Sequence, residues 1–147
     1  MGIKSNIPMK EIEDILRDRI EKAQRVIINT LKYVGEACVS EARSNGDYID
    51  RTGNLRSSIG YVILNNGKIE SENLKASSRG TDRTQGVSEA RGFIRELSGK
   101  YNKGIVLIVV AGMKYASYVE ATRNVLSSAR LLAKKEVPRM LKEIGFK

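Results

Sequence analysis

The chain has no histidine and no tryptophan, and only one cysteine, two prolines and two phenylalanines among its 147 residues. Without histidine there is no imidazole base, no Ser-His or Cys-His nucleophile pair and no histidine-ligated metal site. The single thiol, Cys38, cannot form an intrachain disulfide, and its place on an apolar helix stripe predicts a small core residue. An enzyme is therefore disfavoured, and no catalytic residue, metal or cofactor is predicted.

The sequence also lacks a membrane-length apolar run and a signal-peptide series. The apolar run at residues 105–111 is short and rich in β-branched types, which favours a buried strand, and we expect it to be the central strand of a sheet. A chain with 41% hydrophobic residues is long enough for one core. We therefore expect a single domain over residues 1–147 that folds in the cytoplasm.

Residues 9–44 are predicted to form one long amphipathic helix that stops at Asn45-Gly46. Such a helix would span roughly 50 Å, more than a compact domain of this size requires, so it either kinks or projects. A projecting half would expose apolar surface, which normally packs against a partner. The apolar stripe consists of Ile12, Leu16, Ile20, Ala23, Ile27, Leu31, Val34, Cys38 and Ala42.

A short helical turn and a hairpin are predicted next. Thr52 can cap the turn, although Thr52-Gly53 is also consistent with a simple tight turn. The strand-like residues 61–64 precede Asn66-Gly67, which is a strong hairpin signal. Residues 68–72 are therefore expected to return antiparallel.

Residues 73–86 are mainly polar, which predicts a flexible surface loop. Its basic side chains, Lys75, Arg79 and Arg83, make it a candidate DNA-facing or partner-facing finger, and a tolerated insertion is the alternative. Reversing the charges of Arg79 and Arg83 is expected to leave folding intact. Residues 87–101 then have helical spacing, with Ser88 as the candidate cap.

After Gly112 the spacing becomes helical and places Tyr115, Tyr118 and Val119 on one face. A last helix is predicted over residues 126–144, and Pro138 should kink it unless the helix restarts there. The expected apolar positions of this helix are Ala129, Leu132, Val137, Leu141 and Ile144. Its basic positions are Arg130, Lys134, Lys135, Arg139 and Lys142.

The net charge of +9 is unevenly distributed, with eight basic and three acidic residues from position 105 onward. This excess suggests a polyanionic neighbour, such as nucleic acid or an acidic protein surface, or simply a soluble surface. A free nucleic-acid-binding module using this half and the loop is one hypothesis, although no zinc pattern or helix-turn-helix supports it. An enzyme using Asp47, Asp50 and Glu120 as acid, base or metal ligands is another.

Two motifs carry a family resemblance. The segments Asp50-Arg-Thr-Gly-Asn-Leu-Arg-Ser-Ser-Ile59 and Ala111-Gly-Met-Lys-Tyr-Ala-Ser-Tyr-Val-Glu120, set between a long first helix and a last helix, resemble the head-to-tail joining or tail-completion (neck) proteins of tailed bacteriophages. The resemblance follows the order of nearly the whole chain. The glycine-free run after Glu120 and the long insertion over residues 73–101 suggest a podovirus-like or crAss-like branch.

We therefore expect an α+β fold with a long N-terminal helix, a small antiparallel β-sheet with a helical insertion, and a C-terminal helix packed on the sheet. The resemblance implies a structural virion protein, assembled in the bacterial host cytoplasm, that forms part of a ring in the phage neck around the DNA channel. The partners it implies are further copies of the chain, the portal or adaptor ring, tail proteins and, through non-specific electrostatics, packaged DNA. No membrane partner is expected.

The resemblance also assigns roles to motif residues. Thr52, Gly53, Leu55 and Arg56 would form the loop that enters the sheet, and Tyr115, Tyr118 and Glu120 would form a strand-to-helix corner. From residue chemistry alone, core packing is favoured for Tyr115 and Tyr118, because tyrosine is often partly buried with its hydroxyl paired.

Overall fold

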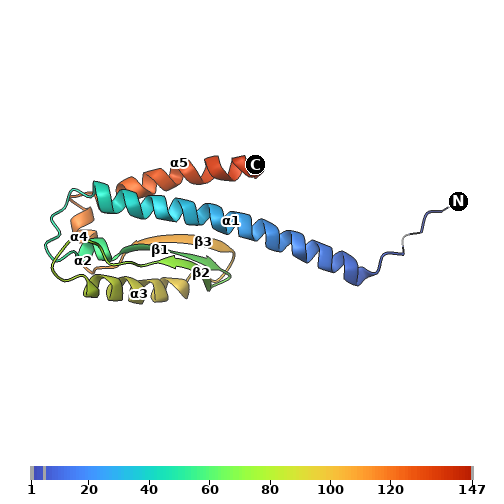
Figure 1. Cartoon of the computed structure of the whole chain (residues 1–147), viewed down its shortest axis with the longest axis horizontal. Coiled ribbons are helices and arrows are strands. Elements are labelled where there is room, and N and C mark those ends of the chain that lie inside the picture. Colours follow the sequence, from blue (N-terminus) through green and yellow to red (C-terminus); the bar gives the residue numbers. More distant parts are fainter. Residues whose placement is uncertain (1, 5, 147) are drawn as a thin grey trace.

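The computed structural model describes residues 2–4 and 6–146, and it has the predicted α+β architecture (Figure 1). A long N-terminal helix precedes a three-stranded antiparallel sheet with a helical insertion, and a C-terminal helix closes the domain. The elements are α1 (Met9–Asn45), α2 (Asn54–Ser57), β1 (Ile59–Asn65), β2 (Lys68–Asn73), α3 (Thr84–Ser98), β3 (Ile105–Ala111), α4 (Ala116–Glu120) and α5 (Ser127–Glu143).

Helices cover both faces of the sheet, with α1 and α5 on one side and α3 on the other (Figure 1). Successive side chains of a strand point to opposite faces. On β1, Ile59, Tyr61 and Ile63 therefore belong to the cluster under α1, whereas Val62 and Leu64 pack against α3. The sheet is the middle layer of three, with β1 buried and β2 largely exposed.

The strand order is β2-β1-β3, so β1 is the central strand and β3 lies at an edge. The prediction that residues 105–111 form the central strand is wrong. Ile59 of β1 lies opposite Ala111, and Asn65 lies opposite Ile105. The apolar run of β3 reflects the helices that cover both of its faces, and it carries no information about whether both of its edges are paired.

The hairpin between β1 and β2 confirms the prediction for Asn66-Gly67. Asn66 and Gly67 have φ values of 50° and 83°, as a type I′ turn requires. The Asn66 side chain also accepts a hydrogen bond of 2.9 Å from the N–H of Gly104, just before β3. The turn therefore tethers the loop that leads into the edge strand.

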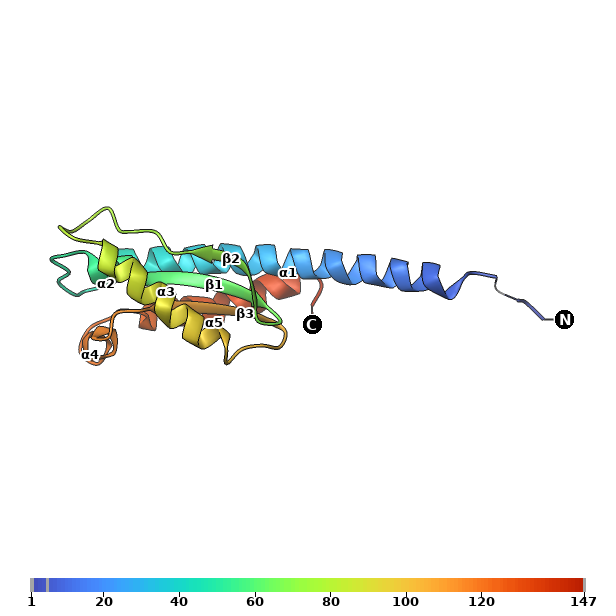
Figure 2. The same cartoon turned by 90° about the horizontal axis from the view of Figure 1, so that it is seen from below.

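Helix α1 runs over 37 residues and projects beyond the body of the domain (Figure 2). Its second half is packed, with Val34, Cys38 and Ala42 fully or almost fully buried. Its first half is exposed along the predicted apolar stripe, at Ile12, Leu16 and Ile20, and also at the neighbouring Ile15. The exposed fractions are 38% for Ile12, 55% for Ile15, 54% for Leu16 and 57% for Ile20.

Helix α5 packs along α1, and its side chains join the cluster over the sheet. The Cys38 thiol donates to the carbonyl of Ala129 at 3.4 Å, which confirms Cys38 as a core residue. Pro138 lies inside the helix, which continues to Glu143. The packed positions include Met140, whereas the predicted apolar position Ile144 is exposed.

None of the helices that the structure describes is long and apolar enough to cross a membrane.

Candidate functional site

The two motif segments, residues 50–59 and 111–120, meet at one end of the sheet, and we call them the motif corner. They meet because β1 begins in the first segment and the antiparallel β3 ends in the second. Ile59 pairs with Ala111, and the N–H of Gly112 donates to the carbonyl of Ser58 at 3.1 Å. The motifs thus form one structural unit although they are distant in sequence.

Asp50 organises the first motif. Its carboxylate accepts the N–H groups of Leu55 and Arg56 at 3.3 and 2.8 Å. The Arg56 guanidinium lies 3.9 Å from this carboxylate and 4.9 Å from the centre of the Tyr48 ring. Leu55 is buried in the core, and the side chains of Asp50 and Arg56 are 2% and 13% exposed. Leu55 and Arg56 therefore hold the corner together and are not free contact residues.

Thr52 is not the cap of α2, contrary to the sequence prediction. The cap position is Gly53, and the Thr52 hydroxyl only accepts the N–H of Asn54 at 3.2 Å. Asp50 was missed as the residue that binds the free N–H groups of this turn. A short acidic side chain just ahead of a helical turn is the signal that could have found it.

The loop between β2 and α3 packs against Gly53 and α2. Gly53 has a φ of +79°, and a Cβ added there would lie 2.0 Å from the carbonyl oxygen of Arg79. The buried Ser77 donates its N–H to the hydroxyl of Ser57 at 2.9 Å, and the Arg83 guanidinium donates to the carbonyl of Ser77 at 2.7 Å. The loop is therefore held in place and is not a free finger, and the exposed Arg83 contributes through its hydrogen bond to Ser77.

The start of α3 also differs from the prediction. The helix begins at Thr84, and Ser88 lies inside it and does not cap it. The Asp82 carboxylate accepts the N–H of Thr84 at 3.3 Å, and the Asn54 side chain accepts the N–H of Gly86 at 2.9 Å. These acceptors satisfy free N–H groups of the first turn, so the helix extends three residues further back than its apolar spacing indicated.

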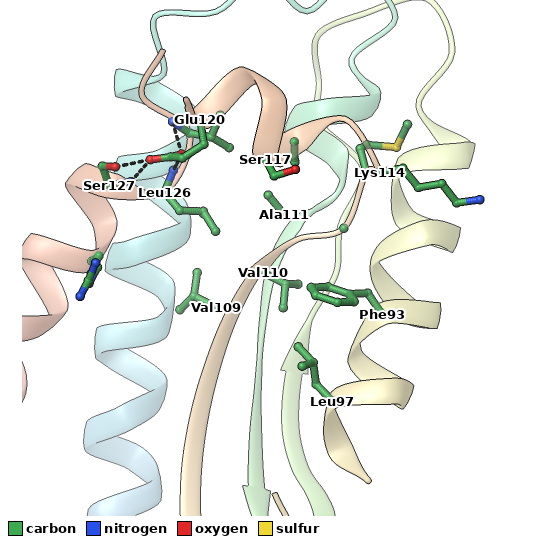
Figure 3. A pocket seen from close by; sticks show the side chains of 15 residues that line it. Phe93, Leu97, Val109, Val110, Ala111, Lys114, Ser117, Glu120, Leu126 and Ser127 are labelled. Atoms are coloured by element: carbon green, nitrogen blue, oxygen red, sulfur yellow. Dashed lines mark hydrogen bonds between the residues drawn. The ribbon is translucent and has the colours of Figure 1, made fainter. Parts of the chain in front are cut away.

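Glu120 organises the second motif (Figure 3). Its carboxylate accepts the N–H groups of Val125, Leu126 and Ser127 at 2.8, 2.7 and 3.1 Å, and it also accepts the Ser127 hydroxyl. Burial by itself would raise the pKa of Glu120, but these hydrogen bonds outweigh burial and hold its pKa below the ordinary value. Glu120 therefore fixes the start of α5 relative to α4.

The two motif tyrosines are not core residues, contrary to the sequence prediction. Tyr118 is 85% exposed and Tyr115 is 43% exposed. The short helix α4 turns Ala116 and Val119 toward the core, which leaves the tyrosines on its outer side. They form an exposed aromatic surface at the motif corner.

A groove of about 630 Å³ opens beside the end of β3, between α3 and α5 (Figure 3). Val109, Val110 and Ala111 of β3 line its centre. Phe93 and Leu97 of α3 line one side, and Leu126 and Arg130 line the other. Lys114 and Ser117 contribute from the motif corner. The groove is mainly apolar, with two basic side chains, and the single lining carboxylate, Glu120, is bound to the N–H groups at the start of α5.

The predicted basic residues do not gather on one face. Lys75 and Arg79 are exposed in the loop after β2, whereas α5 begins beside β3 at the other edge of the sheet. Arg139 is paired with Glu136 and Glu143 of its own helix. Arg130 lines the groove, and the other basic residues of α5, Lys134, Lys135 and Lys142, are exposed.

The three carboxylates considered for catalysis each accept backbone N–H groups. Asp47 accepts the N–H of Asn124 at 2.7 Å, Asp50 binds α2, and Glu120 binds the start of α5. Within the described residues, no group of three or more acidic or cysteine side chains could hold a metal ion. Their observed contacts are those of helix caps and loop anchors.

Comparison of the chain with protein-family models, curated proteins and solved structures finds no match. Functional inference therefore rests on three surfaces of the molecule. These are the exposed first half of α1, the groove beside β3, and the motif corner with its two exposed tyrosines.

Proposed function

We propose that this chain is a structural subunit of the neck of a tailed bacteriophage, where copies form a ring between portal and tail around the DNA channel. The observation that carries the proposal is the pair of unpartnered apolar surfaces, the stripe on the projecting part of α1 and the groove beside β3. Exposed apolar surface of this kind marks protein–protein contact. The resemblance of the two motifs to phage neck proteins indicates which assembly these surfaces would serve.

The position of the two surfaces supports a ring in particular. The free part of α1 extends from one end of the domain, whereas the groove lies near α4 at the other end (Figure 1). Two different surfaces on one subunit favour head-to-tail contacts, and these close into a ring when the rotation between neighbours permits.

The motif corner offers a surface for the rings above or below. Its hydrogen bonds through Asp50 and Glu120 hold the exposed Tyr115 and Tyr118 on a fixed frame. Tyrosine is enriched at protein interfaces, because it has a large apolar ring and a polar hydroxyl. We assign this surface to the portal or adaptor ring or to tail proteins, and the basic excess to non-specific contact with packaged DNA.

The test is the oligomeric state of the purified protein, measured by mass photometry and negative-stain imaging with and without the portal complex of the same phage. Closed rings, alone or only on the portal, would support the proposal. A chain that stays monomeric and ignores the portal would refute it. If that monomer bound DNA with a steep salt dependence, the free nucleic-acid-binding module would be the better assignment.

A further inference from the structure

We infer that the first three turns of α1 in one copy, residues 9–20, dock into the groove beside β3 of the next copy. The inference rests on the proposed ring and names the contact between its subunits. The groove thereby receives a defined occupant, an amphipathic helix from a second copy of this chain.

The helix segment exposes an apolar surface that suits the mainly apolar groove. Met9, Ile12, Ile15, Leu16 and Ile20 are between 38% and 68% exposed. Met9, Ile12, Leu16 and Ile20 follow in steps of three and four, and Ile15 lies beside them on the same side of the helix. In a single chain this stripe remains in water, which is unfavourable because exposed apolar surface is stabilised by burial.

The charges of the two surfaces are complementary. Residues 9–20 carry four acidic side chains, Glu11, Glu13, Asp14 and Asp18, and three basic ones, Lys10, Arg17 and Arg19, and the acidic excess lies in the first two turns. The groove carries the basic Lys114 and Arg130. Opposite charges at the edge of an apolar contact set its orientation and increase the association rate.

The two surfaces cannot meet within one molecule. Residues 9–20 belong to the part of a continuous helix that runs away from the domain, and the groove lies at the far end near α4 (Figures 1 and 2). A helix of 37 residues measures roughly 55 Å, so the stripe starts far from the groove of its own chain. The contact must join two copies, and each copy then offers one helix and one groove.

Two double variants test this arrangement by blocking one surface at a time. Ile12→Glu with Leu16→Glu disables the helix, and Lys114→Glu with Arg130→Glu disables the groove. All four positions are exposed, so both variants should fold. Each variant alone should self-associate at least about tenfold more weakly than the wild type. Lys134→Glu with Lys135→Glu, on the same α5 but outside the groove, is the matched control and should associate like the wild type.

Mixing the two variants gives the decisive readout by sedimentation at high protein concentration. The intact helix of the groove variant should enter the intact groove of the helix variant and form a one-to-one complex that cannot extend. A mixture that stays monomeric overturns the inference. A groove variant that self-associates like the wild type also overturns the inference, because the apolar stripes on α1 of two copies would then be pairing with each other.

A photo-cross-linking amino acid at position 16 locates the contact directly. Cross-linked peptides should contain residues 93–97 or 109–130 of another copy. Cross-links confined to α1 of another copy overturn the inference. If both double variants still form rings like those of the wild type, only this contact is refuted. If the wild type forms no rings either with or without the portal, the proposed function is refuted as well.

Discussion

The backbone N–H of Gly112 donates a 3.1 Å hydrogen bond to the carbonyl of Ser58, and this bond joins the two motif segments. A Cβ on Gly112 would lie 2.3 Å from the Cα of Ala90, so α3 approaches the same point from the other face. The end of β3 is therefore fixed relative to both α2 and α3. The shape of the groove depends on this junction.

Gly112→Ala is expected to destabilise the domain by about 1–3 kcal/mol, because the added methyl group must displace the α3 backbone. Urea unfolding followed by circular dichroism measures the change. Gly92→Ala is the matched control on α3, since among the described residues no atom outside its own stretch of helix lies within 4 Å of its Cβ position. That control should be neutral or stabilise by up to about 1 kcal/mol. Equal effects of the two substitutions would contradict the close approach at Gly112.

Glu120→Gln is expected to lower stability near neutral pH by about 1–2 kcal/mol, because a neutral amide is a weaker acceptor for the N–H groups of α5. Since the pKa of Glu120 is held below its ordinary value of 4.5, the carboxylate's contribution is full above that value and is lost as pH falls through the folded pKa. The free energies of unfolding of the wild type and the variant should therefore converge as the pH falls into the acid range. Glu72→Gln, at an exposed position of β2, should leave stability near neutral pH unchanged.

Tyr48→Phe is expected to protect the domain at alkaline pH. Burial raises the pKa of Tyr48 from 10.0 to about 12. The neutral Tyr48 side chain contributes fully to stability at pH values below its ordinary pKa of 10.0. That contribution is lost as the pH rises through the pKa of the folded state. Phenylalanine keeps the ring beside Arg56 and does not ionise.

The Tyr48 hydroxyl is also buried without a hydrogen-bond partner among the described residues. Its removal should therefore be neutral or slightly stabilising near pH 7. Thermal unfolding over neutral to strongly alkaline pH tests both expectations, with Tyr33→Phe at a 62% exposed position as the control. An alkaline transition that persists unchanged in Tyr48→Phe would exclude Tyr48 as its cause.

Arg83→Ala is expected to cost about 1 kcal/mol, because its guanidinium holds the carbonyl of Ser77 in the loop. Arg79→Ala should stay within about 0.5 kcal/mol of the wild type, since its exposed side chain makes no such hydrogen bond within the described residues. The pair tests the expectation that the charges of Arg79 and Arg83 can be reversed while folding stays intact. Chemical denaturation of both variants decides the point, and equal stabilities would place Arg83 outside the loop's support.

Elements with strong local signals were predicted well from the sequence. The apolar spacing of α1 located both of its ends to within a residue, and Asn66-Gly67 identified the hairpin turn. These features depend on residues close in the chain, so a single sequence contains them.

The position of β3 could not be predicted in the same way. An apolar strand between two helical layers has the same composition whether it is central or at an edge. Pairing with β1 alone is a long-range property, and it determines that the groove lies beside an open edge.

The candidate site was predicted only in part. The two motif segments were singled out separately, and the structure brings them together at one end of the sheet. Tyr118 lies outside because Ala116 and Val119 occupy the buried side of a helix only five residues long. Asp50 and Glu120 bind backbone N–H groups. Because nearly every residue type has this group, the sequence does not reveal which residues these carboxylates contact.

The unsupported first half of α1 has a consequence for the free subunit. Without tertiary packing, a helical segment of this length is only marginally stable in water. In an unassembled copy, residues 9–20 should therefore exchange amide hydrogens and be cleaved by proteases far faster than residues 30–42. Assembly would order this segment, so the subunit would complete its own folding only when a neighbour receives it.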